Sequence, residues 1–394
     1  MTFTKMRSAL LAAIVLAAAA ACGGNNAVPS TPQGAANAAS SQVAAGIESL
    51  GIAPDDTTSI LKKLKKDVVI GSTVDVKNGD RGPRGISVVG SGFGKLKKGQ
   101  IVVCNFEDKG GTAGNGTTVE LLASAPGSKP ARFVQNTKIK GCADAAVSPA
   151  SDYVYVSGFS SHLAVQFTPT GALKKTWGKP LAAPIGDVDG ACPGGPSCLY
   201  SSEYVYVADA NIGGIVSFSV NNYGNKKATE VISGFAVNKK SGWTALGPTA
   251  LAYDAGKSGT LYAIDGVDNT VVSFNNASEL LVADEIAVLK GGKTFKCKYP
   301  KSTCGSLIFA GSPLNAPVAM TRLPNGNLIV ANSGGSSPDT LVELTKAGKV
   351  LATKVVDTSK TAGIFGIYAI GTNDANTALY YTDAIDSSLH ELEQ

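Results

Sequence analysis

The side chains that most often perform catalysis are scarce in this sequence of 394 residues, which contains two histidines, His162 and His390. Neither lies in a G-x-S-x-G or H-E-x-x-H motif, and the sequence has no phosphate-binding P-loop. His162 falls in a turn of the repeat described below, and His390 takes a strand position that is valine in the other copies. Structural roles explain both histidines, so we assign no catalytic residue and expect no metal ion or cofactor.

Cysteines form the second group of chemically notable residues. Cys22 follows an apolar N-terminal segment, and an even number of cysteines remains after it. In an exported chain such a set indicates disulfides. A zinc site made of four cysteines is disfavoured because the sequence has no C-x-x-C pair. We expect two local pairs and one pair by elimination: Cys192–Cys198, Cys297–Cys304 and Cys104–Cys142.

A lysine-rich segment between residues 290 and 313 is the third group. Clustered lysines attract anionic groups, and aromatic rings between them offer flat surfaces to sugars or cations. We hypothesise a surface that binds an anionic envelope glycan, a lipid headgroup or an acidic protein patch. The alternative is a solvated loop whose lysines keep the protein soluble. The candidate residues are Lys293, Phe295, Lys296, Lys298, Tyr299 and Lys301.

These residues must be positioned by a repeated unit, of which Glu203–Val220 (EYVYVADANIGGIVSFSV) is the clearest copy. Its aromatic and β-branched runs predict two strands, and its Asp, Asn and Gly residues predict a tight turn between them. Successive copies lie 53, 51, 56, 67 and 51 residues apart, which indicates a propeller or another β-repeat array. The residues that end the first of the two strands are Asn105, Gly158, Asp209, Asp265, Asn332 and Asp383.

Apolar runs before and after each hairpin, among them Ile286–Leu289 downstream of the Asp265 copy, complete four strands per repeat. The sequence therefore predicts an all-β protein, a six-bladed β-propeller. The last repeat is too short for a fourth strand, whereas Val68–Val76 is a predicted strand with no blade of its own. We expect this strand to complete the sixth blade and close the ring, because an open ring would expose sheet edges. The longest link between blades is expected at Lys290–Pro313.

The N-terminus has the features of a secretory signal, with Lys5 and Arg7 before an apolar run. Residues 16–22 (LAAAAAC) resemble a bacterial lipoprotein signal, which implies that Cys22 is lipidated; an ordinary signal peptide with a stray Cys22 thiol is the alternative. We expect a signal peptide at 1–21, a flexible tether with a possible short helix at 22–66, and the propeller at 67–394. Loss of the signal changes the formal charge from +5 to +3, too little to suggest nucleic-acid binding.

The hairpin from Tyr206 through Asn211 to Phe218 resembles the repeat of NHL-type six-bladed propellers, and the likeness extends over residues 67–394. That wider group includes lactonase-like hydrolases, lyase-like enzymes and non-catalytic binders. The lactonase-like enzymes of that group hold a divalent cation with Glu, Asn and Asp, mostly from first strands that face the axis, so the resemblance implies that a cation site here would lie on the first strands. The corresponding stretches here offer no ligand apart from Asp187 and Asp189. The lyase-like enzymes need an axial histidine, and none is expected at such a strand.

We therefore predict a non-catalytic binding or scaffold module in the bacterial cell envelope, at the outer membrane if the cell is Gram-negative. It is expected to be a monomer that meets the membrane through its N-terminal lipid only. Its partner would be an envelope protein, glycan or lipid headgroup. The alternative is a lactonase- or lyase-like propeller enzyme with an unrecognised site.

Overall fold

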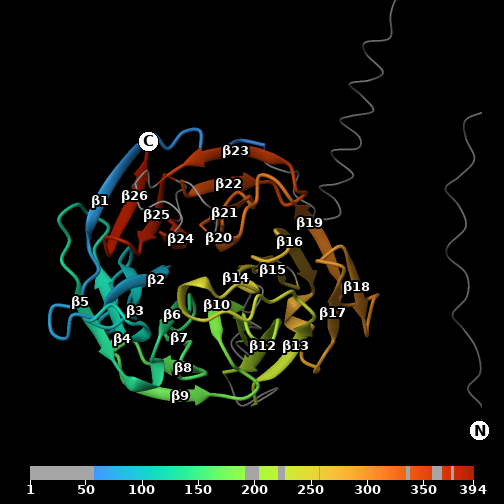
Figure 1. Ribbon diagram of the computed structural model, residues 1–394, viewed down its shortest axis with the longest axis horizontal. Helices are drawn as coiled ribbons and strands as arrows, with labels where there is room; N and C mark the ends of the chain where they lie inside the picture. Colours follow the sequence, from blue (N-terminus) through green and yellow to red (C-terminus); the bar gives the residue numbers. More distant parts are fainter. Residues whose placement is uncertain are drawn as a thin grey trace, which may run out of the picture. The chain divides into compact units, whose positions relative to one another are not determined.

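The computed structural model describes residues 57–190, 204–220, 227–256, 258–333, 338–356, 366–373 and 377–394. These residues form six β-sheets, which stand around a common axis as the blades of a propeller (Figure 1). In each blade the first strand lies nearest the axis and the last strand lies at the rim (Figure 1). The predicted six-bladed β-propeller is confirmed.

The blades are built from the following strands. Blade one contains β2 (Arg81–Val88), β3 (Ile101–Glu107), β4 (Ala113–Leu122) and β5 (Ala131–Gln135). Blade two contains β6 (Cys142–Val147), β7 (Val154–Gly158), β8 (Leu163–Phe167) and β9 (Leu173–Trp177). Blade three contains β10 (Pro184–Gly190), β11 (Tyr204–Asp209), β12 (Gly214–Ser219), β13 (Thr229–Ser233), β17 (Ile286–Leu289) and β18 (Thr294–Cys297). Blade four contains β14 (Pro248–Asp254), β15 (Thr260–Asp265), β16 (Thr270–Asn275) and β19 (Gly305–Ala310). Blade five contains β20 (Pro317–Arg322), β21 (Leu328–Asn332), β22 (Thr340–Leu344) and β23 (Val350–Val355). Blade six contains β24 (Ile367–Thr372), β25 (Ala378–Asp383), β26 (Ser388–Glu393) and β1 (Lys66–Ser72). Short 3-10 turns occur at η1 (Thr137–Ile139), η3 (Gly242–Thr244) and η4 (Ala277–Glu279).

The aspartates that end the second strands hold the blades together. In blade three, Asp209 Oδ1 accepts hydrogen bonds from the backbone N–H groups of Asn211 (3.0 Å) and Ile212 (3.2 Å), which closes the turn. Its Oδ2 accepts from Ala182 (2.6 Å) and Ala183 (2.8 Å) in the link that enters the blade. Asp265 repeats this arrangement in blade four. The repeated aspartates are therefore structural residues, whose oxygens are already used by the backbone.

The ring closes through β1, which pairs antiparallel with β26 and becomes the outermost strand of the sixth blade. Lys66 lies opposite Glu393, and their side chains form an exposed ion pair of 2.6 Å. The prediction that the unassigned N-terminal strand completes the last blade is confirmed. The first and last parts of the propeller are thus joined in one sheet, and β1 covers what would otherwise be the open edge of β26.

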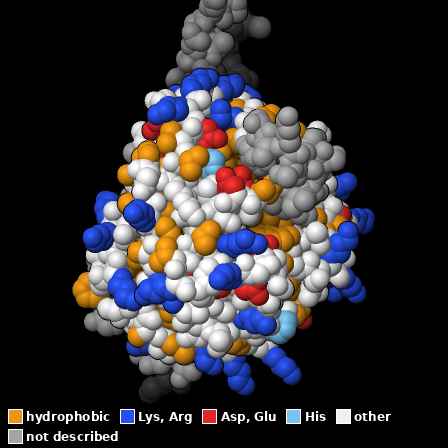
Figure 2. Space-filling view, turned by 60° about the vertical axis from the view of Figure 1, so that its left-hand side comes forward, with side chains coloured by type: hydrophobic (Ala, Val, Ile, Leu, Met, Phe, Trp, Pro, Cys, Tyr) orange, Lys and Arg blue, Asp and Glu red, His pale blue; other side chains and the backbone are white. Residues whose placement is uncertain are grey.

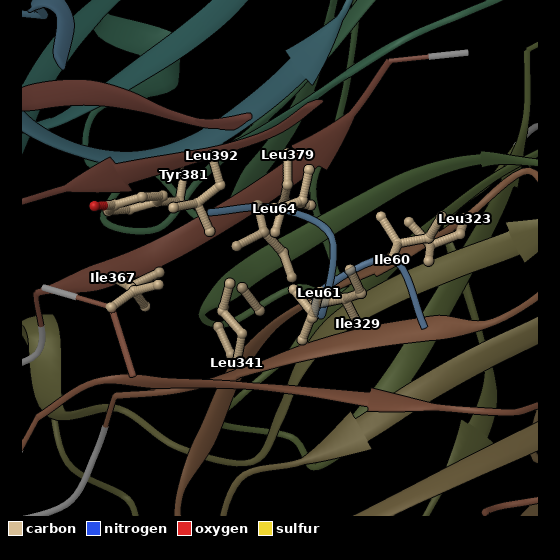
Figure 3. Close-up of a cluster of buried hydrophobic side chains, with 14 of the residues drawn as sticks. Ile60, Leu61, Leu64, Leu323, Ile329, Leu341, Ile367, Leu379, Tyr381 and Leu392 are labelled. Carbon is tan, nitrogen blue, oxygen red and sulfur yellow. The ribbon is translucent and has the colours of Figure 1, made fainter. Parts of the chain in front are cut away.

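Residues Ser59–Leu64, which we call the N-terminal plug, belong to the propeller core. The sequence suggested a short helix on the tether here, but the chain forms a tight turn. Ile60, Leu61 and Leu64 are at most 7% exposed and pack between blades five and six (Figure 3). The carboxylate of Glu343 accepts hydrogen bonds from the Ser59 hydroxyl and from the N–H groups of Ile60 and Leu61, at 2.8, 3.1 and 3.0 Å. The N-terminal plug is therefore part of the folded body rather than a spacer.

The outer strand of blade four differs from the prediction. Ile286–Leu289 was expected there, but it crosses to blade three and pairs in parallel with β13. The outer strand of blade four is β19, from the segment predicted to be a blade link. Leu280 and Ala277, which are fully buried against blade three, carry the chain across. β19 contains the apolar run Leu307–Ala310, but this run was assigned to the link because Ile286–Leu289 already supplied the expected outer strand.

Two of the predicted disulfides are formed, Cys104–Cys142 between blades one and two and Cys297–Cys304 between β18 and the start of β19. Cys22, Cys192 and Cys198 lie outside the described residues. Disulfides persist in oxidising compartments, so the two pairs indicate an extracellular or periplasmic location. None of the helical segments in the described part of the chain is long and apolar enough to cross a membrane.

The two disulfides should differ in their contribution to stability. They span 38 and 7 residues, and the entropy lost by the unfolded chain grows with the length of the closed loop. Replacing Cys104 and Cys142 by alanine should lower the free energy of unfolding by about 4 kcal/mol, and the same change at Cys297 and Cys304 by about 2 kcal/mol. Urea unfolding of the two double variants measures both losses. A larger loss at Cys297 and Cys304 would contradict this ranking.

Candidate functional site

The first strands of the six blades surround a cavity of about 370 Å³ on the propeller axis. A cavity of this size suits a small ligand. Each of the six strands, β2, β6, β10, β14, β20 and β24, contributes lining residues. The cavity reaches the exposed prolines Pro149 and Pro324 at the carboxyl ends of the first strands, where it opens to solvent. We call it the axial funnel.

The opposite end of the axial funnel is filled by aromatic side chains around Arg84. Trp243, on η3 in the link between β13 and β14, lies 4.7 Å from the Phe106 ring and 4.5 Å from the Tyr368 ring. Its indole N–H donates to Glu107 at 2.6 Å. The Arg84 guanidinium lies over the rings of Phe106 (4.5 Å) and Tyr368 (4.8 Å). Tyr368 also lines the cavity, so this cluster forms its floor.

Three aspartates lie in the wall of the axial funnel: Asp144 on β6 and Asp187 and Asp189 on β10. Asp144 accepts hydrogen bonds from the N–H groups of Ala145 (2.9 Å) and Asp187 (2.8 Å). Asp187 accepts one from the Ser157 hydroxyl through Oδ1, whereas its Oδ2 has no hydrogen-bond partner among the described residues. The wall therefore presents an acidic surface that protein donors satisfy in part.

Burial raises the pKa of both Asp144 and Asp187. The pKa of Asp144 rises to about 7, because removal from bulk water outweighs the two backbone donors and the nearby Arg84 charge. The pKa of Asp187 rises well above its ordinary value, through burial first and then through the charge of Asp144. Carboxyls whose pKa is raised by burial in a cavity are common at binding and catalytic sites.

A β-bulge near the start of each first strand positions these side chains. The register between β6 and β7 shifts between Cys142 and Asp144, and the β10–β11 register shifts between Pro184 and Gly186. Neighbouring first strands approach closely there: a Cβ atom on Gly85 would lie 2.3 Å from the Cα of Asp144. Any side chain at residue 85 would push Asp144 out of place. Such bulges re-aim side chains in ways that strand periodicity does not predict.

The sequence identified part of this site. It singled out Asp187 and Asp189 as the acidic residues of the first strands, and both line the axial funnel. It missed Asp144, because the run from Ala145 to Val147 was taken as the strand and the bulged residue before it was not. It also missed Trp243, which lies in a link and carries no strand signal.

Neither histidine lines the axial funnel. His162 is exposed in a turn with φ of +58°, like Ser387 at the equivalent turn of blade six. His390 lies on β26, where Nδ1 is 3.1 Å from Asp67 and Nε2 is 2.7 Å from the Ser388 hydroxyl. His162 is thus a turn residue and His390 a strand residue, both outside the cavity lining.

The funnel aspartates do not form a metal-sized cluster. Within the described residues, the group of His, Cys, Asp or Glu side chains close enough to share an ion is Asp383, Asp386 and His390, on blade six. Asp383 caps the N–H of Ile385 at 2.8 Å, and both ring nitrogens of His390 have neighbours of their own. That group is explained by the turn that it stabilises.

The lysine-rich candidate surface lies on β18 and its flanking turns, at the outer edge of blade three (Figure 1). Lys293, Lys296, Lys298 and Lys301 are exposed, and so is half of Tyr299. Phe295 is partly buried, since it packs edge-on against Phe274 at 6.0 Å and lies against Gly305. Alternation along the strand turns it inward while the lysines face solvent.

The lysines are distributed along the outer edge from one end of the propeller to the other, rather than gathered at one end. The turn at Gly291 lies beside Asp268, at one end of blade four, while Ser302 and Cys304 form hydrogen bonds with Asn275 at the other end.

Figure 2, which brings the left-hand side of Figure 1 forward, shows a different face, on which Lys and Arg side chains are spread out with acidic residues between them. That face carries no extended basic patch of the kind that binds nucleic acids.

Comparison with known proteins identifies the fold and not the activity. No protein-family model and no curated protein matches the chain. A structural-genomics protein of unknown function from Bacteroides thetaiotaomicron is 15% identical, with a TM-score of 0.50 over 83% of this chain and 75% of that one. A virginiamycin B lyase from Staphylococcus aureus is 12% identical, with a TM-score of 0.48 over 84% and 98% of the two chains. A chain of a nidogen–laminin complex is 13% identical, with a TM-score of 0.46 over 71% and 81%. At such identities only the propeller fold is shared, and function has to be argued from the site.

Proposed function

We propose that this protein is an exported binding module, anchored to the bacterial cell envelope by a lipid on Cys22, that takes up a small polar ligand in the axial funnel. The observation that carries this proposal is the acidic cavity on the axis, with an aromatic floor and an open mouth. Its shape is prepared in advance by the rigid first strands, which lowers the ordering cost of binding.

The proposal is tested by blocking the mouth of the axial funnel. Thr321 lines the cavity, so Thr321→Trp should abolish the binding of small polar compounds found by calorimetric or thermal-shift screening of the wild-type protein. Thr294→Trp is the matched control, because Thr294 is exposed on the rim strand β18. Equal loss of binding in both variants, or none in either, would contradict a site in the axial funnel.

The anchor is tested separately. The small-residue run before Cys22 motivates the lipid proposal. Labelled fatty acid should enter the wild-type protein, and Cys22→Ser should release the protein into the soluble fraction without label. A Cys22→Ser variant that stays with membranes would exclude the lipid as the anchor.

A second candidate function is adhesion of the exposed rim lysines to an anionic envelope glycan, lipid headgroup or acidic protein. Changing Lys293, Lys296, Lys298 and Lys301 to serine should abolish retention on anionic envelope polymers at low salt, with little change in melting temperature. The control removes the same charge elsewhere, at the exposed residues Lys62, Lys63, Lys97 and Lys98. Equal retention of both variants and the wild type would show that the lysines only solvate the edge.

The enzymatic alternative, a lactonase- or lyase-like reaction, rests on one observation. Asp144 has a pKa of about 7 inside a cavity, a value suited to general acid–base catalysis near neutral pH. A turnover that Asp144→Asn abolishes, with binding of the same compound retained, would favour this alternative over a binding module.

A further inference from the structure

We infer that the ligand of the axial funnel carries a cationic amino group, which sits against Asp187 and Asp144. This inference rests on the proposed function, and it specifies the chemical class of the ligand. It follows from the charges around the cavity, from the unfilled acceptor on Asp187, and from the spacing of the acidic residues.

The charges around the cavity leave an excess of acid in its wall. Arg84 in the floor faces Asp144 and offsets part of its charge. At the mouth, Arg322 is already engaged by Asp254 at 2.9 Å. The two tyrosines of the lining, Tyr253 and Tyr368, stay neutral, since burial raises the pKa of both.

No cation among the described lining residues is therefore left to offset Asp187. A buried carboxylate without a compensating charge is unfavourable, and a proton or a cationic ligand relieves it. The acidic wall thus favours ligands of positive charge over neutral and anionic ones.

Asp187 shows where the positive group would be placed. The residue is 7% exposed and lines the cavity, and its Oδ2 has no hydrogen-bond partner among the described residues. A buried acceptor of this kind normally has a donor. An alkylammonium group supplies three donors and a positive charge at one point, so it can satisfy Asp187 and reach a second oxygen in the wall.

The spacing of the acidic residues favours an organic cation over a metal ion. A bound divalent cation needs several oxygens gathered around one point. Within the described residues, Asp144, Asp187 and Asp189 do not form such a group. An amine places one N–H on each acceptor and tolerates this wider spacing, and the cavity of about 370 Å³ leaves room for the carbon skeleton behind it.

The test compares three compounds of similar length by isothermal titration calorimetry: 1,4-diaminobutane, 1,4-butanediol and succinate. At pH 8 the diamine should bind at least tenfold more tightly than the diol, and succinate should bind more weakly than either. Because the pKa of Asp144 is about 7, protons compete with the amine at low pH, so affinity for the diamine should fall at least tenfold between pH 8 and pH 5. Asp187→Asn should weaken diamine binding at least tenfold, while Asp268→Asn, at an exposed aspartate in the turn between β15 and β16, should leave it unchanged. Far-UV circular dichroism establishes that each variant is folded.

The outcomes separate this inference from the proposed function. If the diol or succinate binds as tightly as the diamine and Thr321→Trp blocks it, the axial funnel is the site and the cationic ligand is wrong. The cationic ligand is also wrong if none of the three binds while other compounds bind in a manner that Thr321→Trp blocks. If diamine binding survives Thr321→Trp, or no compound binds the wild type, both proposals fail.

Discussion

A chain that begins at Thr73 should lose the cooperative unfolding transition of the full protein and aggregate at micromolar concentration. This truncation removes the N-terminal plug and β1 together. Without β1, the whole length of β26 becomes an open sheet edge, which invites pairing with other chains. Without the N-terminal plug, the apolar surfaces between blades five and six are exposed as well (Figure 3).

Two further truncations separate these effects. A chain that begins at Lys65 keeps β1 and should fold, but with a free energy of unfolding lower by roughly 5 kcal/mol, since Ile60, Leu61 and Leu64 each contribute about 1.5–3 kcal/mol by burial. Glu343 would also lose three of its donors. A chain that begins at Thr57 is the control and should unfold like the full-length protein. Size-exclusion chromatography and urea unfolding measure all three. A monomeric, cooperatively folded chain from Thr73 would show that β1 is dispensable for closure.

The sequence predicted the parts of the fold that local chemistry encodes. The hairpins around Asp209 and Asp265 were found because their strands are apolar on both faces and their turns need Asp, Asn or Gly. The closing strand was found by counting, since the last repeat lacked one strand and the N-terminus had one to spare. The disulfide between Cys104 and Cys142 was found by elimination. Each of these inferences depends on a pattern that spans only a few residues or on a simple count.

The parts that were missed depend on contacts distant in the chain. The N-terminal plug was taken as tether because Glu343, its partner, is more than 280 residues away. β19 was missed because nothing local shows that its apolar run, rather than the nearer Ile286–Leu289, pairs with β16. The floor of the axial funnel unites Arg84, Trp243 and Tyr368 from three distant segments, and no local pattern marks them as neighbours. Site residues on the axis are therefore harder to predict than the blades that carry them.

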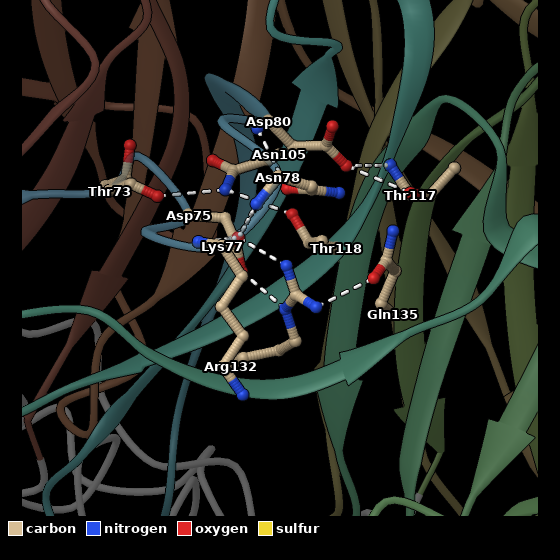
Figure 4. A network of polar contacts seen from close by, with 10 residues as sticks. All are labelled: Thr73, Asp75, Lys77, Asn78, Asp80, Asn105, Thr117, Thr118, Arg132 and Gln135. Atoms are coloured by element: carbon tan, nitrogen blue, oxygen red, sulfur yellow. Dashed lines mark hydrogen bonds and ion pairs between the residues drawn. The ribbon is translucent and has the colours of Figure 1, made fainter.

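Replacing Glu120 by glutamine should make the protein more stable at neutral pH, which is an unusual result for a fully buried residue. Glu120 lies on β4 beside Asp75, which is held by Arg132 in the network of Figure 4. Burial would raise the pKa of Asp75, but hydrogen bonds from Arg132, with others, hold it well below its ordinary value, so Asp75 stays charged. Burial, and then the neighbouring Asp75, raise the pKa of Glu120 to about 9, so Glu120 is neutral in the folded protein at pH 7.

The sign of the effect follows from the proton that folding takes up. In the unfolded chain Glu120 has an ordinary pKa and is ionised above about pH 4.5, whereas the folded protein holds the proton up to about pH 9. Below the pKa of the unfolded chain, Glu120 is protonated in both states and does not make stability depend on pH. Between that pKa and the folded pKa, the free energy of unfolding of the wild type falls by up to about 1.4 kcal/mol for each pH unit, because only the folded protein holds the proton. Glutamine is neutral at every pH, so the difference in free energy of unfolding should shift in favour of Glu120→Gln by up to about 4 kcal/mol between pH 5 and pH 8.

Glutamine fits this position, because the equivalent residue of blade two is Gln166, which is 2% exposed and donates to the Tyr155 hydroxyl at 3.2 Å. The difference is measured by urea unfolding of both proteins at pH 5, 6, 7 and 8. Glu279→Gln, at an exposed carboxylate on η4, is the control and should show no such trend. A Glu120→Gln variant whose stability runs parallel to that of the wild type across this range would mean that Glu120 is ionised in the folded protein. In that case Arg132 would neutralise both carboxylates, and the variant should lose stability at every pH because that ion pair is gone.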